Sequence, residues 1–111
     1  MNYVEAREVL LLARARIETC KSRWICYALE TVALVDESKR ATVEQLKGQI
    51  LEQLGESCSL EGWLVSQGLT TYREVNSDSQ EVRDKLTQTR LNWLDHMIEV
   101  LTQEIQHAKD D

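Results

Sequence analysis

Apolar residues recur at alternating steps of three and four along the first segment of the chain, about residues 2–21. The set is Tyr3, Ala6, Leu10, Ala13, Ile17 and Cys20. This spacing places side chains on one face of an α-helix. Val9, Leu11 and Leu12 widen the face, which predicts that more than one neighbour packs against this helix. Asn2, followed three residues later by Glu5, is typical of a capping box at a helix start.

The same spacing predicts two further helices, at about residues 23–35 and 41–54. Their apolar faces are Ile25, Ala28, Leu29, Val32 and Val35 in the first, and Val43, Leu46, Ile50 and Leu54 in the second. The charged stretch 36–40 either separates them or makes only a local break near Asp36. Thr42 with Gln45 is a candidate N-terminal cap of the second helix, and Gly55 is a candidate C-terminal stop.

The second half of the chain is predicted to hold a short helix at 59–68, an irregular segment at 69–80, and a long helix at 79–107. Asp78 and Glu81 fit a capping box at the start of the long helix. This helix has two adjoining apolar ladders, which are Leu91, Leu94, Ile98, Leu101 and Ile105, and Leu86, Trp93, Met97 and Val100. Such a helix is either central to a bundle or shared between the bundle and a partner.

These elements predict one all-α domain over residues 1–111, a compact bundle of four to five helices with a long C-terminal helix. The length fits a single domain, and the absence of proline leaves long stretches free to be helical. No run approaches the roughly 20 apolar residues of a membrane span, and the first residues do not resemble a signal peptide. We therefore expect a protein of the cytoplasm.

The charge is unevenly distributed. The net charge is −6; residues 1–55 hold eight basic and eight acidic side chains, whereas residues 56–111 hold five and eleven. A general nucleic-acid binder needs a basic surface, so this balance argues against one. A helix–turn–helix at 51–64 is open to the same objection, because its second helix would present Glu56 and Glu61 to phosphates. In the basic first half, Arg7, Arg14 and Lys21 form a stripe that is either a solvated face or a partner-binding one.

Candidate chemistry centres on Cys26, which stands between Trp24, Ile25 and Tyr27. A catalytic thiol needs a base close by, and only a fold that brings His96 near would supply one. We interpret Cys26 as a small residue buried in a helix contact. The cysteines and histidines show no metal-ligand spacing, and no phosphate-binding or nucleophile motif is present. We therefore expect a chain that is not an enzyme and has no metal and no cofactor.

Four pieces of the sequence resemble small uncharacterised helical proteins of tailed bacteriophages. They are "AREVLLLARARIE" (6–18), "WICYALE" (24–30), "LGESCSLEGWL" (54–64) and "RLNWLDHMIEVL" (90–101). The Ile-Cys-x-Ala-Leu and Trp-Leu-x-x-Met-Ile pieces carry most of the likeness. The resemblance implies a phage origin and a helical fold, and the family that it points to has no assigned activity.

By analogy with small acidic phage proteins, we expect a non-enzymatic protein that binds and inhibits or redirects a bacterial host protein. A defence nuclease complex is the leading target, because the acidic second half would suit a basic, nucleic-acid-binding groove. The expected contact is the last helix and the loop before it, through Tyr72, Glu74, Trp93, Asp95, Glu99 and Glu104, with Trp93 as an anchor. The alternatives are a homo-oligomeric assembly module that buries residues 91–101 between copies, a small DNA-binding regulator, and a small enzyme using Cys26 or His96.

Overall fold

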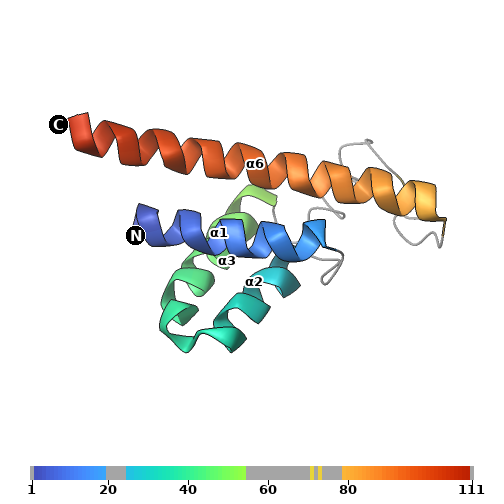
Figure 1. Ribbon diagram of the computed structural model, residues 1–111, viewed down its shortest axis with the longest axis horizontal. Helices are drawn as coiled ribbons and strands as arrows, with labels where there is room; N and C mark the ends of the chain where they lie inside the picture. The colour runs from blue at the N-terminus through green and yellow to red at the C-terminus, as the bar shows by residue number, and fades with distance from the viewer. Residues whose placement is uncertain (1, 20–24, 55–70, 72, 74–78, 111) are drawn as a thin grey trace.

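The protein is an all-α bundle with a long C-terminal helix. The computed structural model describes residues 2–19, 25–54, 71, 73 and 79–110. Within them lie α1 (Tyr3–Glu18), α2 (Ile25–Val35), a 3₁₀ turn η1 (Glu37–Lys39), α3 (Arg40–Leu54) and α6 (Gln80–Asp110) (Figure 1). The predicted fold class and the long last helix are confirmed. The predicted helix at 59–68 lies outside the described residues.

The sequence of α1 fixes both of its ends. The side-chain oxygen of Asn2 accepts a hydrogen bond from the backbone N–H of Glu5 at 3.1 Å, as the capping pattern predicts. At the other end the Thr19 hydroxyl and the Thr19 backbone N–H both donate to the carbonyl of Ala15, at 2.9 Å and 3.0 Å. Between these two caps α1 has 16 residues.

Only a short turn separates α2 from α3 in the sequence, because α2 ends at Val35, η1 follows and α3 begins at Arg40. Asp36 caps the intervening turn, because its carboxylate accepts from the backbone N–H of Ser38 at 3.1 Å and from the Ser38 hydroxyl at 2.6 Å. These bonds lower the pKa of Asp36, with the hydroxyl as the main cause. The predicted cap at Thr42 is wrong. The helix has already begun at Arg40, and Thr42 is buried inside it.

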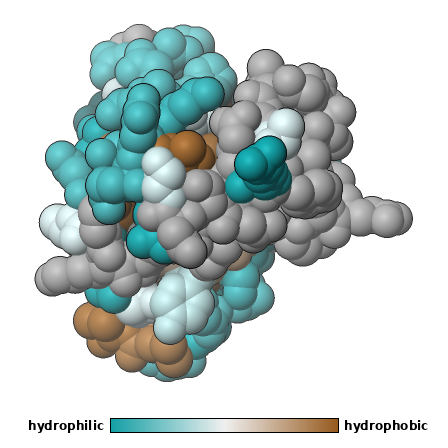
Figure 2. Space-filling view, turned by 90° about the vertical axis from the view of Figure 1, so that its right-hand side faces the viewer, coloured by the Kyte–Doolittle hydropathy of each residue, from teal (hydrophilic) through white to brown (hydrophobic). Residues whose placement is uncertain are grey.

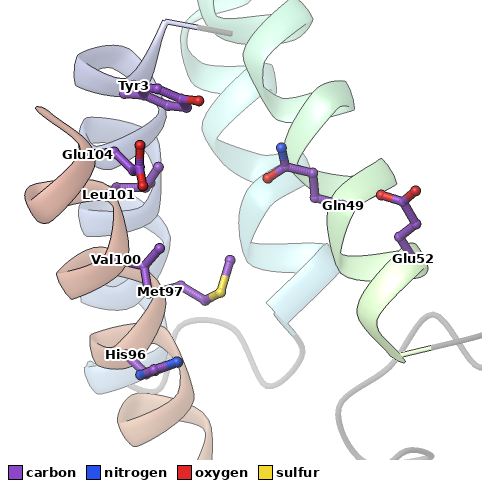
Figure 3. A pocket seen from close by; sticks show the side chains of 8 residues that line it. All are labelled: Tyr3, Gln49, Glu52, His96, Met97, Val100, Leu101 and Glu104. Carbon is purple, nitrogen blue, oxygen red and sulfur yellow. The ribbon is translucent and has the colours of Figure 1, made fainter. Parts of the chain in front are cut away.

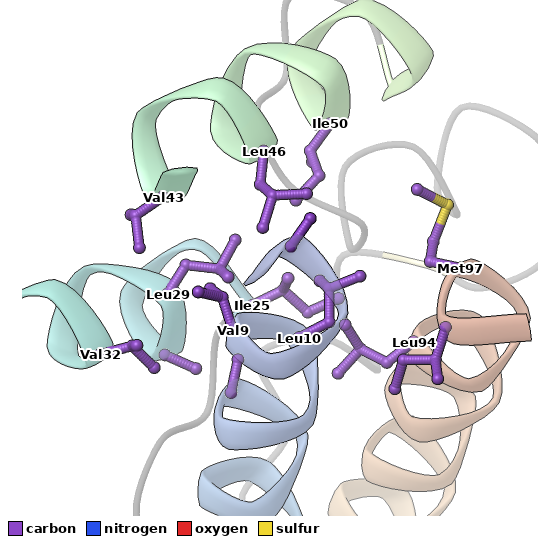
Figure 4. Packing of buried hydrophobic residues seen from close by; sticks show 14 of the residues in the cluster. Val9, Leu10, Ile25, Leu29, Val32, Val43, Leu46, Ile50, Leu94 and Met97 are labelled. Carbon is purple, nitrogen blue, oxygen red and sulfur yellow. The ribbon is translucent and has the colours of Figure 1, made fainter. Parts of the chain in front are cut away.

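The core is built from one apolar face of each helix (Figure 4). Its fully enclosed side chains include Leu10 of α1, Leu29 of α2, Leu46 of α3 and Leu94 of α6, all at most 1% exposed. The three-four ladders therefore predict the core well. Exceptions include Tyr3 at the start of α1, which is 42% exposed, and Val35 at the end of α2, which is 80% exposed.

The central helix of the bundle is α1, which contacts α2, α3 and α6. In Figure 1, α6 lies along one side of α1 and runs antiparallel to it, with both chain ends on the same side of the picture, while α2 and α3 lie on the other side of α1. At 1.5 Å per residue, the 31 residues of α6 span about 46 Å, roughly twice the length of α1. Among the described helices, none is long and apolar enough to cross a membrane.

A cluster of ion pairs joins α2 to α3. Glu30 accepts from Arg40 at 2.7 Å and from Lys47 at 3.0 Å. The hydrogen bond from Arg40, followed by that from Lys47, lowers the pKa of Glu30. The same contacts raise the pKa of Lys47 above its ordinary value. Because Glu30 is the only charged residue of α2, this cluster engages all of the charge on that helix.

Candidate functional site

A groove of about 600 Å³ lies between α3 and the C-terminal half of α6. Figure 3 shows α6 and α1 on one side, α3 on the other, and the side chains of Met97 and Gln49 pointing into the space between them. Tyr3 at the start of α1 lies at one end, and His96 lies toward the other end. The groove exists because α3 and α6 both pack on α1, which holds the two helices apart.

The lining of this α3–α6 groove combines an apolar floor with an acidic rim. Met97 and Leu101 form the floor and are 9% and 7% exposed, while Val100 beside them is 39% exposed. Glu104 of α6 and Glu52 of α3 place one carboxylate on each side. None of the described lining residues is Lys or Arg. Such a groove favours a ligand with an apolar surface and positive charges beside it.

The two apolar ladders of α6 meet at the α3–α6 groove. Leu94 and Ile98 of the first ladder are buried in the core, and Leu101 is buried there and also lines the groove. In the second ladder Met97 is likewise a core residue that lines the groove, whereas Val100 lines the groove and is exposed. The sequence predicts that α6 is either central to the bundle or shared between the bundle and a partner. The central helix is α1, and the second ladder of α6 is partly exposed, at Val100.

The predicted site residues on α6 do not form one patch. Glu104 lines the α3–α6 groove, whereas Asp95 is bound to Arg14 of α1 and Glu99 is exposed. At 100° per residue, Glu104 lies about 180° around the helix from Asp95. The Asp95 carboxylate is therefore part of the α1–α6 contact.

Trp93, the predicted anchor, is half-buried and packs against the core. It lies two helical turns before Val100 on the same side of α6, but it is not among the residues that line the groove. Tyr72 and Glu74 lie outside the described residues. Tyr3, Gln49 and Glu52 complete the groove but were not predicted as site residues. Nothing in the sequence indicates that α3 would lie opposite α6, because that placement depends on how both helices pack against α1.

Cys26 is half-buried rather than buried as expected, and it packs against the core from α2. It lies near Lys47, whose ammonium group is held by the Glu30 carboxylate. His96 is exposed on α6 at the α3–α6 groove. Among the described residues, no three His, Cys, Asp or Glu side chains cluster to hold a metal ion. Of the described residues, those of the groove therefore form the best candidate site.

No protein-family model, no curated protein and no solved structure matches this chain. The resemblance to phage proteins therefore remains a prediction based on four short sequence pieces.

Proposed function

We propose that this chain is a non-enzymatic binding protein and that the α3–α6 groove receives a segment of a partner protein. The observation that supports this best is the combination of Met97, Val100 and Leu101 in the floor and wall with Glu52 and Glu104 on opposite sides. An amphipathic helix commonly docks in such a groove with its apolar face inward. Lys or Arg residues along its edges would then meet the two carboxylates.

The phage resemblance gives the partner a biological class. In that setting the partner is a bacterial host protein, which the phage protein inhibits or redirects. Proteins that bind nucleic acid, such as defence nucleases, have basic surfaces that would match the acidic rim. The groove would then compete with nucleic acid for the same positive side chains.

Affinity capture from bacterial lysate, followed by mass spectrometry, tests this proposal when three forms of the chain are compared. The groove variant is Glu52→Lys with Glu104→Lys. The matched control is Glu81→Lys with Glu99→Lys, which changes the net charge equally at exposed positions of α6 outside the groove lining. We expect the wild type and the control to capture the same partner, and the groove variant to lose it.

Two results would contradict the proposal. One is a partner retained equally by all three forms, which would place the contact elsewhere. The other is equal loss in the groove variant and the control, which would indicate a response to net charge alone. Circular dichroism of each form verifies that the helices are intact. Reversing Asp95 is a poor test, because that change also breaks the contact with Arg14.

A further inference from the structure

A second groove, of about 410 Å³, lies between the start of α1 and the end of α6. Figure 1 shows these two helix ends beside each other, on the side of the picture where both chain termini lie. The apolar lining of this α1–α6 groove is Val4 and Leu11 of α1 with Ile105 of α6. Ile105 lies about 140° around α6 from Val100 of the α3–α6 groove. The two grooves therefore open on different sides of α6.

The apolar lining of the α1–α6 groove is partly open to solvent. Val4 is 62% exposed and Leu11 is 39% exposed. Exposed hydrophobic surface also occurs at the lower end of the molecule in Figure 2, the end where α2 leads into α3 in Figure 1. Leu34 of α2, for example, is 69% exposed and does not line the groove. Apolar exposure alone therefore does not distinguish the α1–α6 groove, whereas its charge does.

The α1–α6 groove has a charge opposite to that of the whole chain. Its charged lining residues are two cations, Arg7 and Lys109, and one carboxylate, Glu8, which sum to one positive charge. The chain as a whole has a net charge of −6. The carboxylate of Glu8 is already engaged, because the ammonium group of Lys39 lies 3.2 Å from it. Lys39 also pairs with Asp36 at 3.5 Å, but Asp36 does not line this groove.

Arg7 is held at the groove by a neutral partner. Its Nε donates to the hydroxyl of Thr102 at 2.9 Å, and that hydroxyl donates to the carbonyl of Ile98 at 2.8 Å. Among the described residues, no carboxylate pairs with Arg7 or with Lys109. The terminal nitrogens of a guanidinium group that is fixed in this way are placed to donate to a carboxylate from outside the chain.

We propose that the α1–α6 groove binds an acidic amphipathic segment of a second protein. The apolar side chains of the segment cover Val4, Leu11 and Ile105, and its Asp or Glu side chains meet Arg7 and Lys109. Nucleic acid and anionic lipid surfaces fit less well, because a chain with net charge −6 is repelled by dense negative charge. The proposal is independent of the α3–α6 groove, whose acidic rim favours the opposite charge.

Selection from a library of short random peptides, with the wild-type chain immobilised, tests this proposal. We expect an enriched peptide class that combines Asp or Glu with large apolar residues. Arg7→Gln with Lys109→Gln should weaken the binding of this class about tenfold or more, because both cationic contacts are lost. The matched control is Arg83→Gln with Lys85→Gln, which changes the net charge equally at exposed positions of α6 outside the groove lining. The control should bind the class like the wild type.

A second pair of variants tests the apolar contact. Val4→Glu places a carboxylate within the groove and should also weaken the acidic class about tenfold or more. Leu34→Glu adds the same charge at a similarly exposed position outside the groove lining, and it should leave the binding unchanged. Circular dichroism of each variant verifies that the helices are intact.

Three results would overturn the proposal. The first is a selection without an acidic, apolar class, or with one that binds the groove variants and the controls equally. The second is binding to phosphatidylglycerol vesicles, in place of peptides, that the groove variants lose. The third is pairing of two copies in sedimentation velocity that the same variants abolish, which would assign the groove to a second copy. Basic peptides that depend on Glu52 and Glu104 report on the α3–α6 groove separately, so either groove can fail alone.

Discussion

The guanidinium of Arg14 on α1 donates two hydrogen bonds to the carboxylate of Asp95 on α6. Nε lies 2.5 Å from Oδ1, and Nη2 lies 3.2 Å from Oδ2. The hydrogen bond to Asp95 is the main cause of a raised pKa at Arg14. A second contact joins the same two helices: Nε of Arg7 donates to the hydroxyl of Thr102 at 2.9 Å. Arg7 lies seven residues before Arg14 on α1, and Thr102 lies seven residues after Asp95 on α6. The two pairs define one antiparallel register, so Arg7 and Arg14 of the basic stripe contact the chain's own last helix.

Replacing Asp95 with Asn is expected to destabilise the fold by about 0.5–1 kcal/mol, the range of a partly exposed ion pair. Arg14 is 26% exposed and Asp95 is 49% exposed at the side chain, so solvent screens part of their attraction. Urea denaturation measures the change, which should shrink in high salt. The control is Glu99→Gln, one turn further along α6, with an expected change near zero. Equal losses of unfolding free energy in both variants would show that the Arg14–Asp95 pair does not stabilise the fold.

The elements themselves could be predicted from local pattern alone. Each helix has its own three-four ladder, and Asn2 has the spacing of a cap, so residues close in sequence determine these features. The partner of the basic stripe could not be predicted this way. Arg14 and Asp95 are 81 residues apart, and only the packing of α6 on α1 fixes their register.

Truncating Leu94 to Ala is expected to cost about 2–5 kcal/mol, because the side chain is fully buried where α6 meets the core. This is a large part of the 5–15 kcal/mol by which a domain is usually stable. Val100→Ala, on the half-open ladder, is expected to cost less than about 1 kcal/mol, since Val100 is 39% exposed. Thermal and urea unfolding compare the two variants. If they lose stability equally, α6 does not pack on α1 in the observed register.

The pH dependence of stability is expected to respond to Glu30. Its pKa in the folded chain is lower than the ordinary glutamate value of 4.5, so the unfolded chain takes up the proton first as the pH falls. The contribution of Glu30 is therefore complete above about pH 4.5 and is lost as the pH falls through the folded pKa. Glu30→Gln should be less stable than the wild type at pH 7, with a gap that narrows toward pH 3.

Denaturant titrations at a series of pH values measure that gap. Glu99→Gln is again the control, because the Glu99 carboxylate accepts a 3.3 Å bond from Gln103 and no ion pair is seen for it among the described residues. A gap between wild type and Glu30→Gln that stays constant from pH 7 to pH 3 would show that the Arg40 and Lys47 contacts do not act through the charge of Glu30.

The candidate site was only partly predictable. The charge of Glu104 and its place on the last helix predict it as a site residue, and it does line the α3–α6 groove. Asp95 has the same charge and lies nearby in sequence, but it points to the other side of α6. Glu52 was missed, because its role depends on α3 lying across from α6. Charge and periodicity identify candidate residues on a single helix. The α3–α6 groove could not be predicted in this way, because it depends on how α3 and α6 each pack against α1.

Cys26 is expected to tolerate a small residue and to reject a large one. It is half-buried and packs against the core at the α2–α3 contact. Cys26→Ala should therefore change the free energy of unfolding by less than about 1 kcal/mol, whereas Cys26→Leu should overpack the contact and cost about 1–3 kcal/mol. Urea denaturation gives both values, and affinity capture with Cys26→Ala should recover the same partner as the wild type. Loss of the partner in a fully folded Cys26→Ala variant would restore the working-thiol hypothesis.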